Sequence, residues 1–260
     1  MTLRHERRGA GPPLVLIHGI GSQWPAWEPV LDRLAVQREV IALDLPGYGG
    51  SPPLPAGVTP TVEALADSVV ELLEQIELSR PHVAGNSLGG WIALELARRG
   101  VVASATALSP AGFWNRREAA YSRSSLRLTV RVARLLDPLA DRLTANPAIR
   151  SLLLAQVVAR PWRIPAPDAA RALRALARSP AFDATLDVIT ARHFTGGAEI
   201  AVPVTIAWGQ RDRLLIPRQA RRAARAIPEA RVVALPGCGH VPMADDPDRI
   251  ARVLLEGSAA

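Results

Sequence analysis

The sequence has a single cysteine, Cys238, among its 260 residues. One thiol can form no intrachain disulfide and no cysteine cluster for zinc or iron–sulfur, so we expect neither a disulfide-stapled module nor such a metal site. No stretch approaches the about 18 apolar residues of a membrane-spanning helix. The charged residues 4–8 precede no apolar region typical of a signal peptide. Together these absences predict a soluble, cytoplasmic protein without an integral membrane segment.

Lysine is absent, so all 31 basic residues are arginine, and the formal net charge is +7. Such a charge raises the question of a nucleic acid or an anionic membrane as partner. Asparagine is also scarce, which together with abundant alanine and arginine indicates codon bias in a GC-rich genome. No aromatic-plus-basic strand pattern or recognition helix is present. We therefore expect a basic surface, a small-molecule substrate and no nucleic acid.

The length and the 48% hydrophobic content suit one core with a small additional part. Short aliphatic segments bounded by glycine or proline alternate with helical patterns, which is typical of a mostly parallel sheet flanked by helices. The sequence thus predicts an α/β fold. The expected strands are 14–18, 40–43, 82–85, 104–108, 204–208 and 232–235. The expected helices are 24–35, 62–76, 88–99, 217–226 and 247–256, the last capped by Asp246 with Pro247 in its first turn.

Residues 113–194 break this alternation, since they hold no strand-like run and six prolines punctuate their helical stretches. We interpret them as an inserted helical lid of about four short helices, with the core formed by residues 1–112 and 195–260. Six arginines between 116 and 134 share a helical region with Leu126, Leu128, Val130 and Leu135. A basic amphipathic helix can lie on a membrane surface, but a solvated face over an apolar one is commoner and is favoured here.

The strongest chemical signal is the segment from Gly85 to Gly90, which ends an expected strand and opens an expected helix. A nucleophile on such a tight turn adopts a strained backbone and needs small residues two positions away on either side. Ser87 occupies the nucleophile position, with Gly85 and Gly89 beside it. The amide of Leu88 then points to where an oxyanion would form.

A serine nucleophile requires a base, and that base requires a carboxylate. Of the five histidines, His240 lies on a glycine-rich loop after the last expected strand, at the sheet edge where open α/β folds bind ligands. Asp212 follows the preceding strand at the same edge. Asp44, after an early strand, is the weaker alternative.

These motifs, together with His18-Gly19-Ile20-Gly21 and the Asp44 to Ser51 segment, resemble the α/β-hydrolase superfamily in order and over nearly the whole chain. The resemblance implies a catalytic triad of Ser87, Asp212 and His240, with a second oxyanion amide from Ile20 or Gly21. It implies loop-shaping roles for His18 and Asp44, and no metal or organic cofactor. The short segment before residue 14 implies that the first antiparallel strands are shortened or missing.

Because the nucleophile position holds serine, the chain does not resemble the dehalogenases and epoxide hydrolases that use aspartate there. We expect a serine esterase or small lipase-like enzyme, with Trp24 and Trp114 as candidate substrate-binding residues and Cys238 as a packing residue. The elbow is also similar to that of carbon–carbon bond hydrolases of ring-cleavage products, although Val241 replaces the tryptophan that commonly follows their histidine. A cofactor-free perhydrolase and a non-enzymatic receptor or scaffold remain as alternatives.

Overall fold

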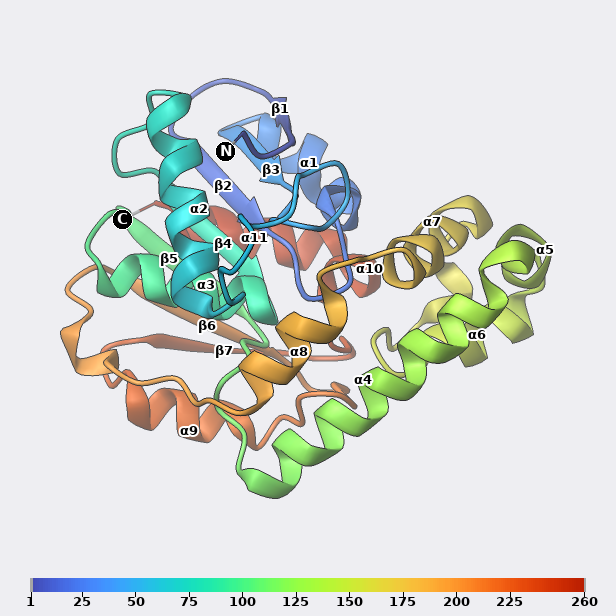
Figure 1. Cartoon of the computed structure of the whole chain (residues 1–260). Coiled ribbons are helices and arrows are strands. Elements are labelled where there is room, and N and C mark those ends of the chain that lie inside the picture. The colour runs from blue at the N-terminus through green and yellow to red at the C-terminus, as the bar shows by residue number, and fades with distance from the viewer. Residues whose placement is uncertain (1, 260) are drawn as a thin grey trace.

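A seven-stranded sheet forms the centre of the computed structural model, which describes residues 2–259 (Figure 1). Its strand order is β1-β3-β2-β4-β5-β6-β7, and every neighbouring pair is parallel except β1 and β3. The strands are β1 (His5–Arg8), β2 (Pro13–Ile17), β3 (Glu39–Leu43), β4 (His82–Asn86), β5 (Ser104–Leu108), β6 (Val204–Gly209) and β7 (Arg231–Leu235). All six strands expected from the sequence are confirmed within one or two residues.

The strand β1 is short, and it pairs antiparallel with β3 at the edge of the sheet. Its four residues are all polar or charged, and Arg7 bonds to Glu39 of β3. One short antiparallel strand is therefore present before β2, in agreement with the expectation of a shortened start.

Helices cover both faces of the sheet because side chains alternate between the faces along each strand. Val15 and Ile17 belong to the core cluster on the side of α2, α3 and α9, whereas Leu14 and Leu16 belong to the cluster on the side of α1 and α11. The helices of the two layers are η1 (Trp24–Trp27), α1 (Glu28–Ala35), α2 (Val62–Gln75), α3 (Leu88–Arg98), α9 (Gln219–Ala226), α10 (Pro242–Asp245) and α11 (Pro247–Gly257). The side chain of Asp246 caps α11 and Pro247 occupies its first turn, as expected.

Residues 113–194, called the insertion below, run between β5 and β6 and extend beside the sheet (Figure 1). They contain α4 (Arg116–Leu136), η2 (Asp137–Leu139), α5 (Ala140–Ala145), α6 (Pro147–Leu154), η3 (Pro161–Arg163), α7 (Ala166–Ala177) and α8 (Phe182–Thr190). The prediction of about four short helices is wrong for the first one, since α4 spans 21 residues. A capping box of Asn115 and Glu118 begins it, and no proline interrupts it before Pro138.

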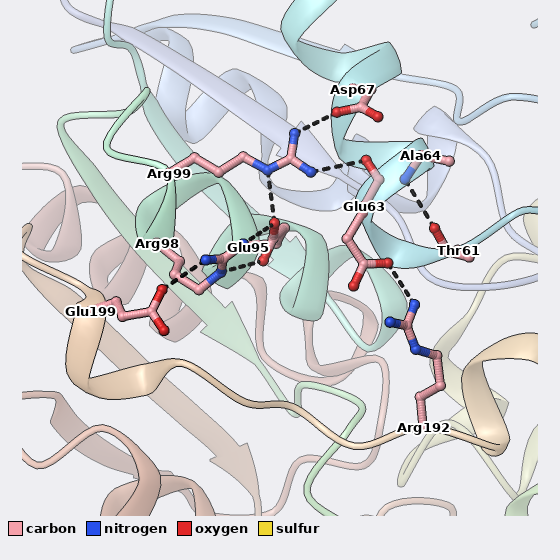
Figure 2. Close-up of polar contacts among 9 residues, drawn as sticks. All are labelled: Thr61, Glu63, Ala64, Asp67, Glu95, Arg98, Arg99, Arg192 and Glu199. Atoms are coloured by element: carbon pink, nitrogen blue, oxygen red, sulfur yellow. Dashed lines mark hydrogen bonds and ion pairs between the residues drawn. The ribbon is translucent and has the colours of Figure 1, made fainter.

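A polar network joins the end of the insertion to the helices under it (Figure 2). Glu95 of α3 is buried and accepts hydrogen bonds from Arg98 and Arg99. Arg99 reaches Asp67 of α2, and Arg98 reaches Glu199 in η4 (Gly197–Glu199), where the chain returns to β6. Arg192, just after α8, bonds to Glu63 at the start of α2. The network thus fixes the end of the insertion, and the segment that leads from it to β6, on α2 and α3.

Candidate active site

Ser87 lies on the turn between β4 and α3 with φ 58° and ψ −115°, a region that residues other than glycine rarely adopt. A Cβ on Gly85 would overlap the carbonyl oxygen of Gly89, and a Cβ on Gly89 would overlap that of Ile17. Only glycine fits at both positions, so the turn closes in the form that the sequence predicts. Ser87 is 7% exposed.

His240 and Asp212 lie together on the loops that follow β7 and β6. The Nδ1 atom of His240 is 2.8 Å from Oδ2 of Asp212, and both residues are buried. Oδ1 of Asp212 accepts from the amides of Leu214 and Leu215 at 2.9 and 2.8 Å. These bonds fix the carboxylate, which in turn favours the tautomer with the proton on Nδ1 and a free lone pair on Nε2.

Asn86 links the nucleophile turn to the histidine loop. Its side-chain amide donates to the carbonyl of His240 at 2.8 Å and to that of Leu108 at 3.0 Å. The residue before Ser87 is therefore bonded to the backbone of His240. Within residues 2–259, the Ser87 hydroxyl itself makes no hydrogen bond, which leaves it available to a reacting group.

Two free amides flank Ser87. The N–H groups of Ile20 and Leu88 have no hydrogen-bond acceptor in the part of the chain that the structure describes. A Cβ on Gly19 would lie 3.1 Å from the Cβ of Ser87, so the loop that carries Ile20 approaches the serine closely. Free amides beside a serine are what stabilisation of an oxyanion requires.

Comparison with known proteins decides the family. The family model described as "Alpha/beta hydrolase family" matches residues 14–253, which is most of the chain. The chain belongs to this family. The family and the fold of this α/β-hydrolase agree with the resemblance in the sequence.

The relatives of this hydrolase carry different activities in their names. It is 31% identical over 247 residues to the dihydrolipoyllysine-residue acetyltransferase component of an acetoin cleaving system from Pseudomonas putida, covering 94% of this chain but 63% of that one. It is 32% identical over 204 residues to the epoxide hydrolase EphH of Mycobacterium tuberculosis, with 73% and 91% coverage. The solved structure of a bacterial membrane phospholipase A superimposes with a TM-score of 0.77 at 29% identity, covering 98% and 83% of the chains.

The expectation that the chain does not resemble epoxide hydrolases is therefore wrong for the sequence as a whole, although the residue at the nucleophile position is Ser87. This hydrolase spans less than two thirds of the length of the P. putida relative. No helix within residues 2–259 is both long and apolar enough to cross a bilayer.

Asp245 is a further residue of this hydrolase's site that the sequence analysis missed. Its carboxylate is buried and accepts three backbone N–H groups: Oδ2 from Gly239 at 2.7 Å and Ala159 at 3.0 Å, Oδ1 from Arg160 at 2.8 Å. Gly239 directly precedes His240, whereas Ala159 and Arg160 belong to the insertion. Asp245 therefore joins the insertion to the histidine loop. Its place five residues after His240 gave no signal, because the partners come from a distant segment.

Apolar side chains of the insertion pack over the oxyanion loop. Phe182 and Leu186 of α8 cluster with Val130 of α4, and Ile20 packs against them. A Cβ on Gly21 would contact Phe182 as well. Because His240 is only 3% exposed, the site is covered in this structure.

His18 and Asp44 hold loops, as the resemblance implies. The amide of Leu45 donates to Nε2 of His18, and Nδ1 contacts the carbonyl of Gly19 at 2.7 Å. Burial lowers the pKa of His18, so the ring is neutral and has both nitrogens engaged. The Asp44 carboxylate accepts from the amides of Trp24 and Gly50.

The two candidate substrate-binding tryptophans occupy different surroundings. Trp24 is partly buried in η1 and packs against the core cluster under α1 and α11. Trp114 is buried, donates its indole N–H to the carbonyl of Arg192 and lies edge-on to Trp91. These contacts show that Trp114 packs between α3 and the insertion. Cys238 is also buried, and burial raises the pKa of its thiol to about 11, which leaves it unreactive at neutral pH.

Proposed function

We propose that this hydrolase cleaves a small or medium apolar carboxylic ester through a covalent acyl-enzyme on Ser87. The observation that carries the proposal is a strained, glycine-flanked serine whose neighbour Asn86 is bonded to the backbone of a buried histidine. The Nδ1 atom of that histidine lies 2.8 Å from an aspartate. Because Nδ1 of His240 is bonded to Asp212, Nε2 is the ring nitrogen left to act as the base. The similarity to a protein named as a phospholipase A, which cleaves an ester, supports the same class of bond.

In the proposed reaction, Ser87 Oγ attacks the ester carbonyl carbon while Nε2 of His240 takes the hydroxyl proton. The tetrahedral oxyanion accepts from the amides of Leu88 and Ile20. The C–O bond then breaks, and His240 returns the proton to the departing alcohol. Water, deprotonated by the same nitrogen, attacks the acyl-enzyme and releases the acid. Asp212 stays ionised and stabilises the imidazolium throughout.

We further propose that residues 113–194 act as a cap over a core of residues 1–112 and 195–260. The apolar residues Phe182, Leu186 and Val130 above Ile20 suit an apolar acyl chain. Since Ser87 and His240 are nearly inaccessible, substrate entry requires displacement of these covering side chains. The proposed small-molecule substrate thus enters between the cap and the oxyanion loop.

The test is hydrolysis of p-nitrophenyl esters of increasing acyl length by the wild type and Ser87→Ala. We expect turnover by the wild type and loss of at least about 10³-fold in the variant. Cys238→Ala is the matched control and should retain activity. Consumption of a dienoate ring-fission product without ester turnover would favour carbon–carbon hydrolysis, and peracid formation would favour the perhydrolase. A folded wild type that turns over none of these would favour the scaffold.

A further inference from the structure

The helix α4 has apolar side chains on its outward face. Leu128, Val132 and Leu135 recur at spacings of four and three residues, and Leu139 continues the line into η2. A helix brings such positions to one side. Their exposed fractions are 63%, 37%, 78% and 49%, in chain order. We call these four residues the outer stripe.

The side chains of the outer stripe do not pack in the core of the insertion. The side of α4 that packs inward carries Val130 and Ala133, which are 1% exposed, and Val130 belongs to the cluster over the oxyanion loop. Leu128 and Val132 lie two residues to either side of Val130 and therefore point away from that cluster. Packing therefore explains the apolar residues on the inner side of α4 but not those of the outer stripe, which are exposed to solvent.

The insertion also accounts for the net positive charge of the protein. It holds fourteen arginines and six carboxylates, a net charge of +8, whereas the rest of the chain holds seventeen arginines and eighteen carboxylates, a net charge of −1. On α4, Arg123 and Arg127 pair with Asp187, and Arg134 pairs with Asp183. Arg117 and Arg131 make no ion pair within residues 2–259, and Arg131 lies three residues after Leu128.

We propose that the outer stripe and its arginines dock the insertion on an anionic lipid bilayer. An apolar strip with arginines alongside can enter the acyl boundary while the guanidinium groups reach the lipid phosphates. A second copy of the chain is disfavoured as the occupant, because two faces of the same positive charge repel each other. Trp162, on η3 of the same insertion, is exposed and is a residue type common at the membrane interface.

This docking is independent of the proposed ester chemistry, so binding is measured without substrate. The experiment is co-sedimentation of the full chain with vesicles of phosphatidylcholine alone and of phosphatidylcholine with phosphatidylglycerol. We expect binding to the anionic vesicles that falls steeply between about 0.05 M and about 0.5 M salt, because ions screen the attraction. Binding to neutral vesicles should be at least about tenfold weaker, given about fivefold for each arginine near the surface.

Leu128→Glu combined with Leu135→Glu tests the apolar part. We expect a loss of about 30-fold or more in binding, since two exposed leucines no longer enter the lipid and two negative charges face it. The matched control is Val36→Glu, an equally exposed apolar residue at 80%, just after α1 and outside the insertion. Arg131→Glu should weaken binding, with Arg252→Glu on α11 as its control.

All variants must melt at the wild-type temperature, as expected for exposed positions outside the site. Absence of binding by the wild type overturns the proposal. Vesicle binding by the double leucine variant that equals that of the wild type also overturns the proposal, because charge alone would then explain the attraction. A dimer in light scattering that the double variant dissociates, without vesicle binding, would identify the stripe as a contact between copies and would equally overturn it.

Discussion

Replacing Asp245 tests whether the insertion and the histidine loop are coupled. In Asp245→Ala, the N–H groups of Gly239, Ala159 and Arg160 lose their acceptor. A buried unsatisfied donor costs about 1–3 kcal/mol. Water entering the vacated space can satisfy one or two of the three donors. We therefore expect the free energy of unfolding to fall by about 3 kcal/mol.

Asp245→Asn gives a graded comparison, because the amide keeps one acceptor oxygen. Oriented toward Gly239 and Ala159, that oxygen retains two bonds, and only the Arg160 N–H is left facing an NH₂ group. The expected loss is about 1–2 kcal/mol. The readouts are denaturant unfolding and kcat on a soluble ester. Release of Gly239 lets His240 shift, so kcat should fall about 10- to 100-fold in the alanine variant, with a smaller fall in the asparagine variant.

Asp246→Ala is the matched control, since this neighbouring carboxylate caps α11 through the amide of Arg249 and does not contact the histidine loop. Loss of the cap should cost about 1 kcal/mol while kcat stays within about twofold. A higher kcat in Asp245→Asn than in Asp245→Ala would show that Asp245 acts by positioning the histidine loop. Equal effects of the Asp245 and Asp246 changes on kcat, under conditions where both variants are folded, would refute the reasoning.

Three further predictions concern stability and reactivity. Burial alone would raise the pKa of Glu95, but its two arginine partners outweigh this and hold the pKa below its ordinary value, so its contribution is present above about pH 4.5 and is lost as the pH falls. Denaturant unfolding of Glu95→Gln should therefore show a loss of about 1–3 kcal/mol at neutral pH and little loss near pH 3, and an equal loss at both values would contradict this. Cys238 should resist alkylation in the native state at about pH 8 and react after unfolding, as read by mass spectrometry, and rapid native labelling would contradict its burial. Gly85→Ala should abolish ester turnover or folding because its Cβ overlaps Gly89, whereas Gly57→Ala, which meets no atom within 4 Å, should cost about 1–2 kcal/mol and keep activity; an active Gly85→Ala would contradict the steric argument.

The sequence predicted the sheet well because its buried strands are short aliphatic runs with clear ends. It missed β1 because His5–Arg8 is a polar edge strand without alternation, held by pairing with β3 and by the bond from Arg7 to Glu39. The unbroken length of α4 was readable from the absence of proline before Pro138. The outer stripe could not be predicted from the sequence, because only the packing of α4 shows which of its apolar residues face inward.

For the site, the order along the chain predicts Ser87, Asp212 and His240 as partners, since strand ends at one sheet edge converge. The structure brings His240 and Asp212 into contact and ties the elbow to the histidine loop through Asn86. Asp245 could not be predicted in this way, because its function depends on residues 159 and 160 of the insertion, more than 80 positions away in sequence. Close approaches of this kind are a property of the folded chain alone.

The most direct test of the central proposal is covalent labelling by a fluorophosphonate probe, with the modified residue mapped by mass spectrometry. An activated serine should be labelled once, at Ser87. Labelling should be lost in Ser87→Ala and be strongly slowed in His240→Ala, because the base that removes the proton is gone. Labelling at another serine, or undiminished labelling in the folded Ser87→Ala variant, would contradict the assignment of Ser87 as nucleophile.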